Sequence, residues 1–63
     1  MKKFWNGKIK KIEVYEKETK RRIAAFLADD KATEQGLVLF YENGKEIYWY
    51  DSSQCYHKVV SVS

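Results

Sequence analysis

The chain has few of the residues on which catalysis and metal binding depend: of its 63 residues, one is histidine, one is cysteine and three are glycine. A single cysteine, Cys55, excludes an internal disulfide and indicates a reducing compartment, the cytoplasm. The three glycines lie far apart, which excludes a glycine-rich phosphate loop. Zinc needs about four Cys, His or acidic ligands, so we expect no metal and no cofactor.

Cys55 and His57 are the one pair with catalytic potential. They lie two residues apart, so on an extended strand they would share a face, where a thiolate and an imidazole can act together. No third orienting motif accompanies them, and no paired-carboxylate or serine-elbow motif is present. Asp29 and Asp30 lack the spaced acids and glycine of a calcium loop, which favours a solvated turn. We therefore predict that the chain is not an enzyme.

Long apolar runs are also missing, which excludes a membrane span, and the basic start is not followed by the apolar stretch of a signal peptide. Hydrophobic residues nevertheless make up 44% of the chain and aromatic residues 16%, too much for a disordered tail. We expect residues 1–63 to fold as a single small domain without a membrane partner.

The clearest structural pattern is the segment "LVLFYENGKEIYWYD", in which two runs of β-branched and aromatic residues flank Asn43-Gly44. This pair favours a type I′ hairpin turn, so we predict strands over 37–42 and 45–50. A two-residue loop would place Phe40 opposite Ile47 and Val38 opposite Trp49. The predicted core face is Val38, Phe40, Ile47 and Trp49.

Two readings of residues 20–35 remain open. As a helix, this segment has an apolar stripe that ends after one turn, and its charges oppose the helix dipole. As a strand, Arg21 to Ala28 would pair back on "IEVYE" through the turn "KETK", with "IAAFLA" as a central strand buried on both faces and "DDKATEQ" as a loop. We favour the strand.

The remaining segments also predict strands. Asn6-Gly7 favours a turn between strands 2–5 and 8–16, with a bulge or bend near Lys10 and Lys11, where the apolar positions change phase. "DSSQ" predicts a turn and "HKVVSVS" a closing strand. About five or six short antiparallel strands at this length predict a mainly β fold, a small SH3-like or Tudor-like barrel. The alternative is an α+β fold with one helix at about 20–35 packed on an antiparallel sheet.

Lysine and arginine are concentrated in the first third of the chain, whereas residues 23–63 carry more acids than bases. The hairpin predicted in this basic part of the chain could neutralise phosphates, and aromatic rings can stack on single-stranded bases. The interleaved acids Glu13, Glu16 and Glu18 fit a solvated hairpin instead. The candidate nucleic-acid-binding residues are Lys8, Lys10, Lys11, Lys20, Arg21, Arg22 and Trp5.

The predicted second face of the 37–50 hairpin carries Tyr41, Tyr48 and Tyr50, which would form a protein interface, because tyrosine buries a large area yet keeps a polar tip. Two functions follow. The first is a non-enzymatic nucleic-acid-binding module. The alternative is an adaptor or inhibitor that contacts a host or cellular protein through this face or a strand edge, as a phage or mobile-element protein would, acting as a monomer or homodimer.

Overall fold

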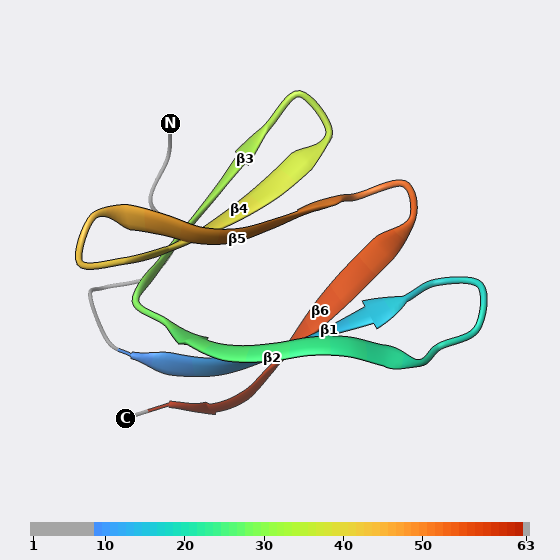
Figure 1. The fold of residues 1–63 in the computed structure, drawn as a ribbon, viewed down its shortest axis with the longest axis horizontal. Coiled ribbons are helices and arrows are strands. Elements are labelled where there is room, and N and C mark those ends of the chain that lie inside the picture. The colour runs from blue at the N-terminus through green and yellow to red at the C-terminus, as the bar shows by residue number, and fades with distance from the viewer. Residues whose placement is uncertain (1–8, 63) are drawn as a thin grey trace.

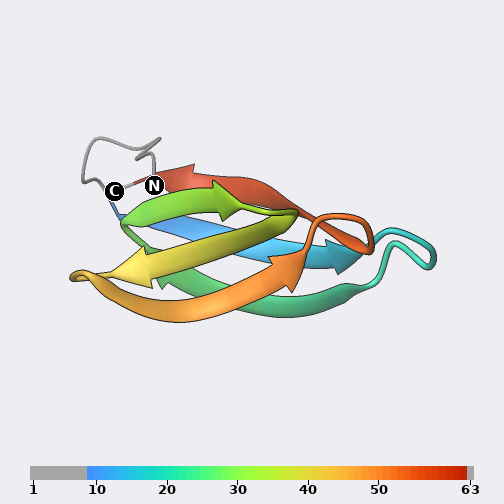
Figure 2. The same cartoon turned by 90° about the horizontal axis from the view of Figure 1, so that it is seen from above.

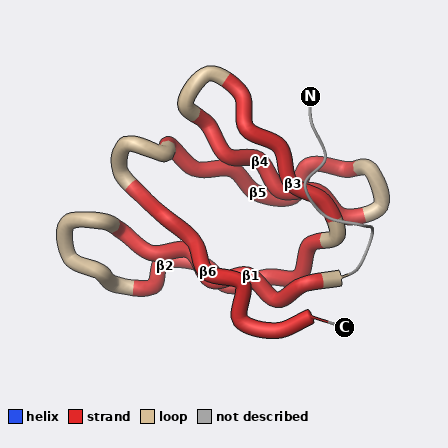
Figure 3. The backbone as a smooth tube through the Cα atoms, turned by 180° about the vertical axis from the view of Figure 1, so that it is seen from behind, coloured by secondary structure: helices blue, strands red, loops and turns tan. Residues whose placement is uncertain are grey.

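The computed structural model describes residues 9–62, in which the chain forms strands and turns and no helix (Figure 3). The six strands are β1 (Lys10–Glu16), β2 (Arg22–Ala28), β3 (Asp30–Glu34), β4 (Leu37–Glu42), β5 (Lys45–Asp51) and β6 (Cys55–Val62). They make two antiparallel sheets with the strand orders β2-β1-β6 and β3-β4-β5 (Figure 1). The mainly β prediction is confirmed, and the alternative helix at about 20–35 is wrong.

The predicted Asn43-Gly44 hairpin is present. Both residues have positive φ angles, 53° and 79°, as a type I′ turn requires, and Glu42 lies opposite Lys45. The predicted strands at 2–5 and the start of the 8–16 strand, with the Asn6-Gly7 turn, lie outside the described residues.

The predicted loop at "DDKATEQ" is wrong, because most of this segment is β3, paired with β4. Gln35 and Gly36 form a second tight turn with φ angles of 50° and 81°, and this turn places Glu34 opposite Leu37. Asp29 alone separates β2 from β3, so the chain passes from one sheet into the other at a bend (Figure 1). Pairing with β4 thus makes a strand of a segment whose local composition favours a loop.

The predicted central position of "IAAFLA" is also wrong. β2 pairs with β1 through the predicted turn, but it is the edge strand of its sheet, and β1 is central between β2 and β6. Ile23 and Leu27 are accordingly 52% and 51% exposed. β1 is central because the closing strand β6 pairs with its other side.

Among residues 9–62, three of the four strand pairs contain a β-bulge, in which one strand has an extra residue: Ile23 in β2, Val60 in β6 and Ile47 in β5. A bulge increases the local twist and bends the strand. The β1–β6 register shifts directly after Lys11, close to the bulge or bend predicted near Lys10 and Lys11, but the extra residue belongs to β6 and not to the strand for which it was predicted.

The bulge at Ile47 changes which side chains of β5 face the core. Phe40 lies opposite Tyr48 rather than Ile47, and Val38 lies opposite Tyr50 rather than Trp49. The predicted core positions Val38 and Phe40 are confirmed. The predictions of Ile47 and Trp49 as core are wrong, because these side chains are 40% and 55% exposed.

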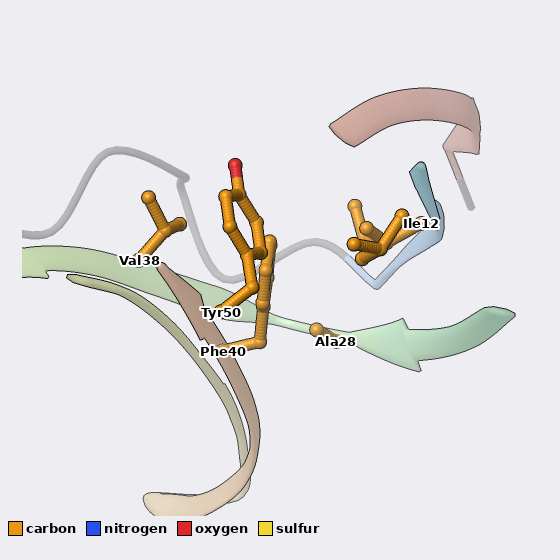
Figure 4. Packing of buried hydrophobic residues seen from close by; sticks show 6 residues of the cluster. Ile12, Ala28, Val38, Phe40 and Tyr50 are labelled. Atoms are coloured by element: carbon orange, nitrogen blue, oxygen red, sulfur yellow. The ribbon is translucent and has the colours of Figure 1, made fainter. Parts of the chain in front are cut away.

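The core lies between the two sheets. Its buried cluster draws on both of them and consists of Ile12, Val14, Ala28, Val38, Phe40 and Tyr50 (Figure 4). Phe26 of β2 packs against this cluster, with its ring centroid 5.0 Å from that of Phe40 and 4.9 Å from that of Tyr48. Aromatic contacts therefore hold the sheets together across the core.

The sheets lie one over the other, with β3-β4-β5 in front of β2-β1-β6 when seen from above (Figure 2). The chain joins them at Asp29 and at the turn of residues 52–54, but among residues 9–62 no continuous ladder of strand pairing closes them into a barrel. The described part of the chain contains no helix with the length and apolarity needed to span a membrane.

Candidate nucleic-acid interface

The predicted basic residues do not all lie together. Lys11 and Arg22 lie on the outer face of β2-β1-β6, whereas Lys10 lies on the same side of β1 as the buried Ile12 and is half-buried. Lys20 and Arg21 are exposed in the turn between β1 and β2. The other two, Lys8 and Trp5, lie outside the described residues.

Strand alternation defines the outer face of β2-β1-β6. Ile12 and Val14 are fully buried, so the β1 side chains between and beside them point outward. Their register partners on β2 and β6 complete this surface, which we call the basic face: Lys11, Glu13, Tyr15, Arg22, Ala25, Leu27, Tyr56 and Lys58. It carries three cationic side chains and one acidic side chain.

Two tyrosines form the aromatic part of the basic face. Tyr15 and Tyr56 lie directly opposite each other on β1 and β6, and their rings stack with centroids 5.4 Å apart and planes 14° apart. The Lys58 ammonium lies 5.2 Å from the centroid of the Tyr15 ring, within cation–π range. The face thus combines flat rings with flexible cations.

Glu13 orders this surface. Its carboxylate accepts a hydrogen bond from the Tyr15 hydroxyl at 2.6 Å and pairs with the Arg22 guanidinium at 2.9 Å. The hydrogen bond from Tyr15 and then that from Arg22 lower the pKa of Glu13, while the same bond to Glu13 raises the pKa of Tyr15. At neutral pH Glu13 is therefore anionic and Tyr15 protonated, which holds the ring and the guanidinium in place.

Sequence reasoning found Lys11 and Arg22 but missed Tyr15, Tyr56 and Lys58. The alternation in "KIEVYE" places Tyr15 on the same face as Lys11, and that signal was available. No local signal indicated the β6 residues Tyr56 and Lys58, because their place on this face depends on the register between β1 and the far end of the chain.

The Cys55 and His57 pair lies on the inner side of β6, where the hydroxyl of Tyr50 and Nδ1 of His57 are hydrogen-bonded at 2.6 Å. Burial, followed by the nearby charge of Lys31, lowers the pKa of His57. Burial likewise raises the pKa of Tyr50. Nδ1 of His57 is thus hydrogen-bonded to the Tyr50 hydroxyl rather than to Cys55. This hydrogen bond satisfies a polar ring nitrogen beside the core.

The three tyrosines of the predicted protein interface do not share a face. Tyr50 is 6% exposed and belongs to the core, and Tyr48 is half-buried beside it against Phe26. Tyr41 lies on the opposite side of the sheet. The bulge at Ile47 causes this separation, because it shifts the phase of β5 by one residue relative to β4.

No protein-family model matches the chain, no curated protein matches it, and no solved structure matches it. Its function is therefore inferred from its own geometry.

Proposed function

We propose that the chain is a small, non-enzymatic module that binds single-stranded nucleic acid on the basic face. The observation that carries this proposal is the stacked pair Tyr15 and Tyr56, with Arg22 and Lys58 beside it and Lys11 farther along the same face. Stacking on tyrosine is tolerant of sequence because every base has a π-face, and the cations neutralise the phosphates that accompany the bases.

The path of the strand follows from the position of the cations. Bases stack over the tyrosine pair at the Arg22 end of the face, while the backbone runs past Lys58 and towards Lys11. Lys20 and Arg21, exposed in the adjoining turn, extend the positive surface beyond the sheet. The negative charge of Glu13 weakens the positive potential at the centre of the basic face, so we expect a moderate affinity for nucleic acid.

We also propose a finer description of the fold, an SH3-like barrel in which β2 and β3 are the two halves of one bent strand shared by both sheets. The single-residue separation at Asp29 supports it, together with the hydrogen bond of 2.9 Å that the Asp29 amide donates to the Tyr41 carbonyl oxygen. The free thiol of Cys55 fits a reducing compartment, and we propose the cytoplasm.

Fluorescence anisotropy with labelled oligonucleotides tests the function. The full chain is titrated into oligo-dT and oligo-U of about 12 nucleotides, and into a duplex, across a salt series. We expect single strands to bind better than the duplex, with an affinity that falls steeply as salt rises. No binding at low salt would refute the proposal.

Variants locate the binding face. Replacing Lys11, Arg22 and Lys58 together by serine should reduce the slope of log K against log salt by about 2, since each lost phosphate contact removes about 0.7 for single strands. Tyr56→Ser should weaken binding by about 1–3 kcal/mol. The control is Lys45→Ser, which changes an exposed lysine of the other sheet. If Lys45→Ser lowered the affinity and the salt slope as much as the variants of the basic face do, binding would be diffuse and not on the basic face.

A further inference from the structure

The outer surface of β3-β4-β5 has a different chemistry from the basic face. Val38 and Phe40 point into the core, so the alternating residues of β4 point outward. With their register partners they make three rows, which we call the acidic face: Asp30, Tyr41 and Glu46; Ala32, Leu39 and Trp49; Glu34, Leu37 and Asp51.

The acidic face is apolar along its middle row and carries two carboxylates in each outer row. Trp49, directly opposite Leu39, is 55% exposed. The pKa of the Tyr41 phenol is raised first by burial and then by three surrounding carboxylates, those of Glu46, Glu34 and Asp30. None of the nine positions carries a lysine or arginine. The exposed indole of Trp49 thus lies between two rows that carry the exposed carboxylates of Glu34, Glu46 and Asp51.

We infer that the acidic face is a docking surface for a cationic protein segment, whose apolar side chain covers Trp49 and Leu39 while its lysines or arginines meet the carboxylates. Charge complementarity selects this occupant, because the four carboxylates repel nucleic acid and anionic lipid alike. Tryptophan supplies the contact energy, since it is prominent among interface hot spots and its ring face attracts cations.

The three rows also define how far apart the contacting side chains of the partner must lie. Leu37 and Tyr41 are four residues apart on β4, so the two acidic rows are separated by about 13 Å with the apolar row midway. An extended segment with the pattern cation-x-apolar-x-cation places its three alternate side chains on one face at that spacing. In a helix the same pattern would place its two cations only about 6 Å apart along the axis, so this pattern fits the rows only as an extended segment.

Nuclear magnetic resonance with the ¹⁵N-labelled full chain tests this docking. One probe is the peptide "SKTLTKS", which has the required pattern. The matched control is "STKLKTS", which has the same composition and charge but places its cations and its leucine on opposite faces. We expect the first peptide to shift the amide signals of Leu39 and Trp49 and the Trp49 indole signal, and to bind at least about fivefold more tightly than the second.

Variants separate docking from general attraction. Trp49→Ala should weaken binding of "SKTLTKS" about tenfold. Replacing Glu34 and Glu46 by glutamine, which keeps the shape of both side chains, should weaken it and flatten its salt dependence. Leu27→Ala removes a comparably exposed apolar side chain, 51% against 55%, from the basic face and should leave binding unchanged.

Several outcomes would overturn the inference: no shifts at millimolar peptide, equal binding of both peptides, or shifts confined to the basic face. Self-association that Trp49→Ala abolishes, without peptide binding, would make a second copy the occupant instead. Because the oligonucleotide and the peptide act on opposite outer faces, failure of one proposal leaves the other standing.

Discussion

The inward position of Tyr50 and the outward position of Trp49 can be tested by replacing each with leucine. Tyr50→Leu removes the hydrogen bond to Nδ1 of His57, worth about 0.5–1.5 kcal/mol, and ring contacts with Phe40 and His57 worth a similar amount. We therefore expect a loss of about 2 kcal/mol in the free energy of unfolding. Trp49→Leu changes a side chain that is 55% exposed, and we expect less than about 0.5 kcal/mol.

Urea unfolding followed by far-ultraviolet circular dichroism measures both changes without depending on the tryptophan signal. A chain of 63 residues has a total stability of about 3–9 kcal/mol and an m-value of about 1 kcal/mol/M. Tyr50→Leu should then lower the midpoint by about 2 M, while Trp49→Leu should hardly move it. If Trp49→Leu lowers the midpoint as much as Tyr50→Leu or more, the hairpin has the register without a bulge and the core described above is wrong.

Three further predictions concern charge, pH and backbone. Glu13→Gln should raise the affinity for single-stranded nucleic acid in anisotropy titrations with little effect on stability, because it releases the exposed Arg22 and removes a negative charge; weaker binding would contradict the proposed face. The pKa of His57 lies below its usual 6.5 in the fold, so the unfolded chain binds the proton first. The free energy of unfolding should therefore fall as pH drops from about 7 to 5, and His57→Gln should flatten that fall in urea titrations. Gly44→Ala forces alanine to a φ angle of 79°, and calorimetry should show a loss of about 1 kcal/mol, or about 4–8 °C in Tm.

Local turn chemistry made part of the fold predictable. Asn43-Gly44 identified the β4–β5 hairpin, because Asn and Gly tolerate the positive φ angles of its turn. The polar segment "KETK" identified the turn between β1 and β2, although Lys20 adopts a φ angle of 61° there. Gln35-Gly36 adopts the same geometry as Asn43-Gly44 but was not recognised, since glutamine is unusual at a positive φ angle. Without that turn, the segment that forms β3 was predicted as a loop.

The bulges were harder to predict, and the one at Ile47 determines which aromatic side chains of β5 face the core. At Ile47 both the bulged and the regular register place aromatic or aliphatic side chains on each face, so hydrophobic pattern alone does not distinguish them. Packing of Tyr48 and Tyr50 against the aromatic rings of the core decides between the registers. Likewise, Tyr56 and Lys58 join Tyr15 only through long-range pairing with β6, which no local signal encodes.

The three bulged residues all lie on edge strands: Ile23 on β2, Ile47 on β5 and Val60 on β6. Many β-proteins place proline on such strands to stop other chains from adding to the sheet, but this sequence has none. A bulge interrupts the regular row of amides and carbonyls and twists the edge, so a second chain cannot pair along its full length. Among residues 9–62, the residues that bend the sheets thereby also hinder a second chain from adding at three of the four sheet edges.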